Sequence, residues 1–189
     1  MQRALLVLLL GVAIVAIEAT LLVRADMHLL TLTDLLPSLV SLGLLVLAGV
    51  WVTLRPLQRR PLGAGVLRAL VLASLALPVL LAFAHPSTDH PASLMGSEGN
   101  FGRYVASCLG HGLALCGIVW LSFRVLDRGE LRGQGARLTA GTTAALVAVL
   151  GLVLHCPIAS ATHWLLGHAG IGFLALFASL VTLRWIRKS

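Results

Sequence analysis

Residues 35–54, LLPSLVSLGLLVLAGVWVTL, decide the fold of this chain. The stretch contains no ionisable side chain. A helix of this length covers about 30 Å at about 1.5 Å per residue, which matches the hydrocarbon core of a bilayer. Because lipid offers no hydrogen-bond partners, the backbone must satisfy its own N–H and C=O groups. The stretch therefore predicts a transmembrane helix.

Similar apolar stretches recur along the whole chain. Hydrophobic residues make up 58% of the 189 residues and charged residues 11%, with a mean hydropathy of +0.97. A soluble domain carries roughly 25% charged residues. We therefore predict one all-α, polytopic transmembrane domain over residues 1–189, a six-helix bundle whose first helix is uncleaved because its apolar core is longer than that of a signal peptide. The predicted spans are 4–23, 35–54, 65–84, 104–123, 138–154 and 163–183.

The 14 basic residues, in a chain of net charge +7, alternate between the two sides of the predicted bundle. Twelve fall on one side and two, Arg24 and Arg103, on the other. By the positive-inside rule, the richer side and both termini are cytoplasmic, as an even number of spans requires. Their position in short loops also argues against direct nucleic-acid binding. The twelve are Arg3, Arg55, Arg59, Arg60, Arg68, Arg124, Arg128, Arg132, Arg137, Arg184, Arg187 and Lys188.

Cysteines and histidines gather on the opposite, outer side. Cys108 lies about one turn into the fourth span and Cys156 just past the fifth. These two spans form a hairpin, so we expect the two thiols to be neighbours, in a disulfide or sharing a ligand. Sulfur and imidazole ligands suit Zn²⁺, Cu⁺ or haem iron. The candidate imidazole ligands are His111, His155, His163 and His168.

Metal binding is one interpretation of these histidines, and a second interpretation stays open. Each one, taken alone, is also explained as an interfacial polar residue satisfied by water or headgroups. His163 and His168 are five residues apart, about 140° around an α-helix, so they do not form the i, i+4 pair of a helical metal site.

No catalytic constellation is present. The sequence has no Ser-His-Asp order, P-loop, H-E-x-x-H motif or paired intramembrane carboxylates. We therefore do not expect an enzyme.

Three features of the last part of the chain occur together. They are Cys108 in the fourth span, the turn His155-Cys156-Pro157 and the ending Leu183-Arg184-Trp185. By these residues the chain resembles the NrsF-type six-helix membrane anti-sigma factors. The resemblance implies a protein of the bacterial inner membrane that sequesters an extracytoplasmic-function sigma factor. It would release that factor on an envelope, metal, oxidative or light-derived signal, with Cys108 and Cys156 as the sensing residues.

The resemblance also implies a cytoplasmic surface that grips the sigma factor. Similar proteins carry a soluble stretch before the first span, whereas three residues precede it here. Either that stretch is missing from this sequence, or the basic loops bind the partner. The candidate partner-binding residues are Arg55, Arg59, Arg60, Arg124, Arg128 and Arg132.

Two other functions compete with this one. The main alternative is a metal- or haem-binding membrane redox subunit that uses the outer histidines. Gly167, Gly170 and Gly172 permit close helix packing, which is typical of a structural subunit in a membrane complex.

Overall fold

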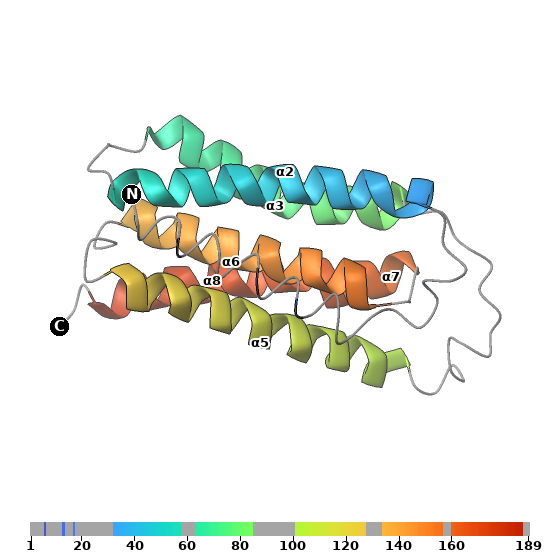
Figure 1. Cartoon of the computed structure of the whole chain (residues 1–189). Helices are drawn as coiled ribbons and strands as arrows, with labels where there is room; N and C mark the ends of the chain where they lie inside the picture. The colour runs from blue at the N-terminus through green and yellow to red at the C-terminus, as the bar shows by residue number, and fades with distance from the viewer. Residues whose placement is uncertain are drawn as a thin grey trace.

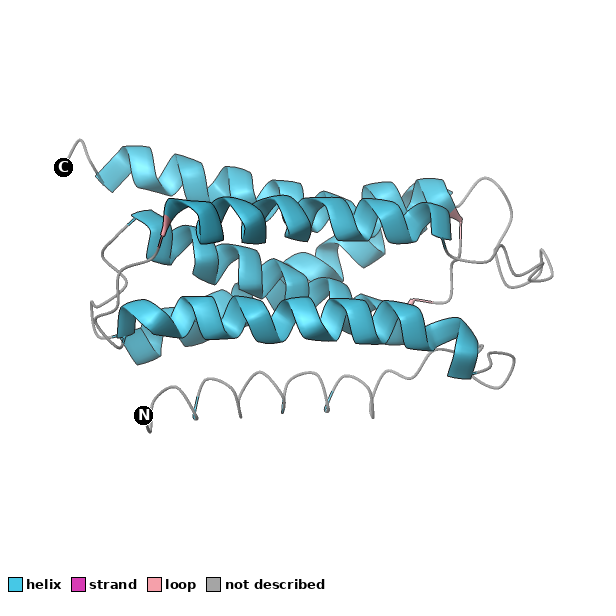
Figure 2. Cartoon of the chain, turned by 90° about the horizontal axis from the view of Figure 1, so that it is seen from above, coloured by secondary structure: helices cyan, strands magenta, loops and turns pink. Residues whose placement is uncertain are grey.

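The computed structural model describes residues 32–57, 63–84, 101–127, 134–156 and 160–186, together with the isolated helical positions Leu6, Ala13 and Ile17. All its elements are helices that run side by side (Figure 2). They are α2 (Leu32–Leu57), α3 (Ala64–Ala84), α5 (Phe101–Asp127), α6 (Gln134–His155), α7 (Ala161–His163), the π-helix η3 (Trp164–Ala169) and α8 (Gly170–Ile186).

Five of the predicted spans correspond to helices that are long and apolar enough to cross a membrane. These are α2, α3, α5, α6 and the continuous helix made by α7, η3 and α8. The first predicted span, 4–23, lies outside the described ranges apart from the three isolated positions. The described part of the chain is thus all-helical and contains five helices suited to a bilayer, while the sixth span and the side on which the termini lie stay predictions.

Helix α6 is the centre of the bundle. It contacts α2, α3, α5 and α8 (Figure 1). Of its span, 78% is buried inside the protein, against 22–39% for the other four. Many of its buried side chains are small, among them Ala144 and Ala148, which are fully buried. Small residues let neighbouring backbones approach closely. Helices in lipid associate through such close packing, because there is no hydrophobic driving force between them.

Large apolar side chains point away from this centre. Leu72, Phe83 and Phe177 are 66–70% exposed, whereas Thr53 and Thr143 are fully buried and their hydroxyl oxygens lie 3.1 Å apart across α2 and α6. In water an exposed apolar surface of this extent would be unfavourable. The distribution, with hydroxyls inside and large apolar groups outside, is the one that a lipid environment favours.

The helices alternate in direction, so the bundle has two distinct ends. The C-terminal ends of α2, α5 and α8 gather at one end (Figure 1). The beginning of α5, the end of α6 and the short helix α7 gather at the other. The two cysteines expected to be neighbours belong to this second end.

Candidate metal centre

Four metal-ligating side chains meet where α5, α6 and the last helix converge. They are Cys108 in α5, Cys156 just after α6, His163 at the end of α7 and His168 in η3. One ligand atom from each lies within 4.8 Å of the other three. The expected proximity of Cys108 and Cys156 is found, because their Sγ atoms are 3.3 Å apart. The group supplies two sulfurs and two imidazoles to one point.

Two of the separations are within about 0.5 Å of those around a tetrahedral ion. Around zinc, with Zn–S near 2.3 Å and Zn–N near 2.0 Å, ligand atoms lie roughly 3.3–3.8 Å apart. The Cys108–Cys156 sulfur distance is 3.3 Å, and the Cys156 Sγ lies 3.2 Å from the His163 Nε2. The widest separation in the group, 4.8 Å, needs to close by about 1 Å to reach that range. All four residues could therefore hold one ion with side-chain movements alone.

The site is shielded from solvent. His163 and His168 are 0% exposed and Cys156 is 3% exposed, while Cys108 is half-buried. The Nδ1 of His163 has no hydrogen-bond partner within the described part of the chain. The nitrogen that faces the cluster is the other one, Nε2, which lies 3.2 Å from the Cys156 Sγ.

The ends of two helices position Cys156 and His163 at this point. The backbone N–H of Cys156 donates to the carbonyl of Leu152 at 2.7 Å, which extends the last turn of α6 by one residue. Ser160 then caps the next helix, since its hydroxyl accepts the N–H of His163 at 3.2 Å. Cys156 and His163 are thus fixed by the end of one helix and the beginning of the next.

The π-helix corrects the expectation that His163 and His168 cannot form a pair. That expectation assumed a continuous α-helix. Within η3 the helix closes with i→i+5 hydrogen bonds, as in the N–H of Gly170 directed at the carbonyl of Leu165. Residues five apart then lie one turn apart, and the two imidazole centroids are 5.6 Å from each other.

Aromatic side chains and a glycine complete the surroundings. The Trp164 ring is tilted by 32° from that of His168, with ring centroids 4.4 Å apart, and Phe101 meets His163 edge-on at 6.4 Å. A Cβ built on Gly167 would lie 3.5 Å from both the Cys108 Cβ and the His163 Nε2. Sequence reasoning did not identify Phe101 or Gly167 as part of the site. No local pattern marks them, since both reach it through the packing of α5 on the last helix.

His111 and His155, also predicted as ligands, lie outside the four-residue group. Their rings face each other across α5 and α6 with centroids 5.0 Å apart, and both side chains are half-exposed. They therefore adjoin the centre without belonging to it.

Two of the six predicted partner-binding arginines, Arg55 and Arg124, are among the described residues, and both belong to the other end of the bundle. Arg55 is in the last turn of α2, where its guanidinium lies 4.0 Å from the centroid of the Trp51 ring. Arg124 is in the final turn of α5. The remaining four, Arg59, Arg60, Arg128 and Arg132, lie outside the described residues.

Comparison with protein-family models, with curated proteins and with solved structures finds no match for this chain.

Proposed function

We propose that this chain is a bacterial inner-membrane anti-sigma factor whose sensing element is a metal ion bound by Cys108, Cys156, His163 and His168. The observation that carries the proposal is the convergence of these four side chains within 4.8 Å from three helical segments. A change in the occupancy of this centre would release an extracytoplasmic-function sigma factor on the cytoplasmic side.

Electrostatics favours a divalent ion such as Zn²⁺. Two thiolates and two neutral imidazoles carry a total charge of −2, which a divalent ion cancels. A neutral site avoids the large cost of burying net charge, whereas Cu⁺ would leave one negative charge. Two cysteines and two histidines are also a common ligand set of structural zinc sites. The convergence of all four atoms suits one ion better than a haem, whose axial ligands lie on opposite faces of the macrocycle.

Two further observations support a sensing role over a purely structural one. Cys108 is half-buried while the other ligands are buried, so the centre is reachable from one side. The two described arginines that the resemblance assigns to sigma-factor binding, Arg55 and Arg124, belong to the opposite end of the bundle. By the charge rule, the metal centre would face outside and the arginines the cytoplasm. The resemblance to NrsF-type proteins assigns the same two cysteines to sensing.

Metal analysis of the purified protein tests the centre. We expect about one zinc per chain, lost in the double variant Cys108→Ser/Cys156→Ser. The matched control is Cys116→Ala, because Cys116 is a buried cysteine of the same helix α5 outside the cluster. Metal content unchanged in the double variant would contradict the assignment of the ligands.

Co-purification and a sigma-dependent reporter test the regulatory role. We expect the wild-type chain to retain the sigma factor and repress the reporter, and we expect zinc depletion to relieve repression. The cysteine double variant should lose this response while Cys116→Ala keeps it. A chain that binds metal but never retains a sigma factor would favour the metal-binding redox subunit, and a Soret band in its absorbance spectrum would identify haem.

The basic loops give a separate test of partner binding. Glutamate in place of Arg124, Arg128 and Arg132 reverses the charge of one loop without touching the metal centre. We expect retention of the sigma factor to fall at least about tenfold, which corresponds to about 1.4 kcal/mol, with zinc content unchanged. Retention that is unaffected by the reversal would remove this loop from the interface.

A further inference from the structure

Between His163 and Gly170 the last helix contains one residue more than a regular α-helix would have over the same stretch. The π-turns of η3 accommodate this extra residue, and they alone bring His163 and His168 onto one face. In a continuous α-helix the same two side chains would diverge by about 140°. An ion shared by both histidines therefore binds only the π conformation.

Because the ion binds one conformation of η3 and not the other, it shifts the equilibrium between them. A ligand that binds one of two conformations shifts the equilibrium toward it, by as much as its affinity for the two differs. The π-helix is intrinsically rare and is found mostly as short bulges at functional sites. An ion in the centre would hold the π-turns in place, and its loss would allow them to relax toward the α-helical form.

Relaxation would move α8 by one register position. If the segment Ser160–His163 stays in place, each residue of α8 moves to the place that the next residue occupies in the structure. The helix then turns by about 100° and advances by about 1.5 Å. Leu174 would take the place of Ala175, and Ala178 the place of Ser179. The larger Leu174 side chain would need space beside α5 and α6.

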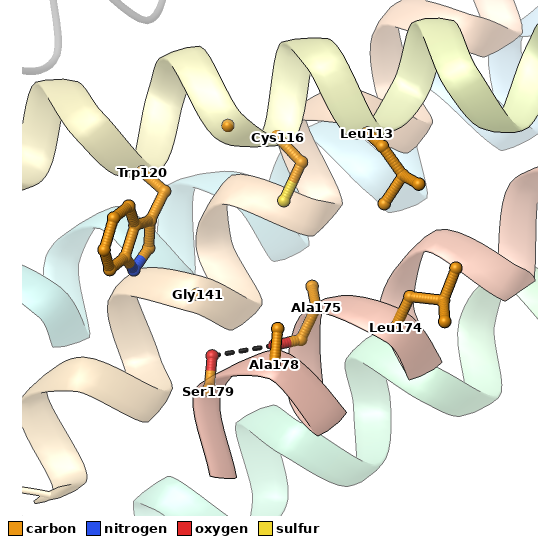
Figure 3. A pocket seen from close by; sticks show the side chains of 9 residues that line it. Leu113, Cys116, Trp120, Gly141, Leu174, Ala175, Ala178 and Ser179 are labelled. Atoms are coloured by element: carbon orange, nitrogen blue, oxygen red, sulfur yellow. Dashed lines mark hydrogen bonds between the residues drawn. The ribbon is translucent and has the colours of Figure 1, made fainter. Parts of the chain in front are cut away.

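The bundle contains space at that place. A cavity of about 300 Å³ lies between α5, α6 and α8. Figure 3 shows Cys116 and Trp120 of α5 on one side of it and Ala175, Ala178 and Ser179 of α8 on the other. Its lining is almost wholly apolar and mostly made of small side chains. A closely packed interface would resist a one-residue shift. Leu174 already lines this cavity, and the space beside it lets the side chain move to the place of Ala175.

We propose that η3 is a one-residue register switch. An ion shared by His163 and His168 holds α8 in the register described above, and loss of the ion lets α8 step into the cavity lined by Cys116 and Trp120. The switch rests on the metal centre of the proposed function and adds the means by which its occupancy reaches the other end of the bundle.

Deletion of Leu166 is the decisive variant. Leu166 lies within η3 and is 52% exposed, so its removal takes no core side chain away. With it removed, the two histidines are four apart in an ordinary α-helix and again share a face. We therefore expect the deletion variant to bind zinc while α8 keeps the same register with and without the ion. Leu166→Ala, which preserves the residue count, is the matched control and should behave as the wild type.

Fluorine NMR of 5-fluorotryptophan-labelled protein in lipid nanodiscs reports the movement. Trp120 faces the cavity and its resonance should shift when a chelator removes zinc from the wild type. Trp51, exposed on α2, should not shift and serves as an internal reference. In the deletion variant, zinc removal should leave the Trp120 resonance unchanged.

The outcomes distinguish a failure of the register switch from a failure of the metal centre. If zinc binds the wild type and its removal leaves Trp120 unchanged, the switch is overturned and the metal centre stands. A Trp120 shift of wild-type size in the deletion variant also overturns it, since the movement would not need η3. If the wild type binds no zinc, the metal centre itself fails. Should the deletion variant not fold, the wild-type chelation experiment still decides.

Discussion

The replacement of Gly49 by alanine tests the packing of α2 on the central helix. A Cβ at this position would lie 2.7 Å from the Thr143 Oγ1 and 3.3 Å from its Cγ2. Thr143 is fully buried and its hydroxyl lies 3.1 Å from that of Thr53, so it has little freedom to move. Overpacking costs about 1–3 kcal/mol, and loss of the hydroxyl contact adds about 0.5–1.5 kcal/mol.

Gly43 provides a control in the same helix, since a Cβ there meets nothing within 4 Å. Both substitutions gain about 1 kcal/mol of helix propensity, and this gain cancels in the comparison. We expect Gly49→Ala to be less stable than Gly43→Ala by about 2–4 kcal/mol. Reversible unfolding in mixed detergent micelles, followed by circular dichroism, measures the difference. Two variants of equal stability would refute the close approach of α2 and α6.

Three other predictions concern the centre and the core. Diamide should oxidise the two cluster thiols of the zinc-free protein to a disulfide and leave Cys116 reduced. Intact-mass analysis after thiol labelling should show that bound zinc blocks this oxidation. Equal rates of disulfide formation with and without zinc would contradict the shared site. Trp164→Leu should weaken zinc binding about 10–100-fold in a competition titration, because the indole orients the His168 ring; an affinity equal to the wild type would count against this. Ala148→Leu should destabilise the bundle by about 1–3 kcal/mol, because that position is fully buried, and Ala106→Leu on the exposed side of α5 should not.

The sequence carried the information for the spans and for the cysteine pair. Apolar length alone located the five described spans, and the described helices extend the predicted spans 35–54 and 104–123 by only a few residues at each end. The proximity of Cys108 and Cys156 followed from connectivity, because adjacent antiparallel helices bring their outer ends together. These inferences need only the hydrophobic pattern and the order of elements.

The pairing of the two histidines was beyond the sequence. The segment Trp164–Ala169 contains nothing that distinguishes a π-turn from an α-turn, and its conformation depends on packing by neighbouring helices. For the same reason His111 and His155 could not be separated from the ligands. All four histidines lie at one end of the bundle, but only side-chain direction shows which rings converge with the thiols.

The central position of α6 bears on the order in which the bundle can assemble. A chain is synthesised from its N-terminus, so α2, α3 and α5 are made before the helix that all three pack against. Until α6 arrives, buried hydroxyls such as that of Thr53 lack their partner on the central helix. The last two ligands, His163 and His168, are made later still. The four ligands can therefore meet only in a chain whose helix α8 has packed against the rest, and a metal ion held by all four would report that this packing has taken place.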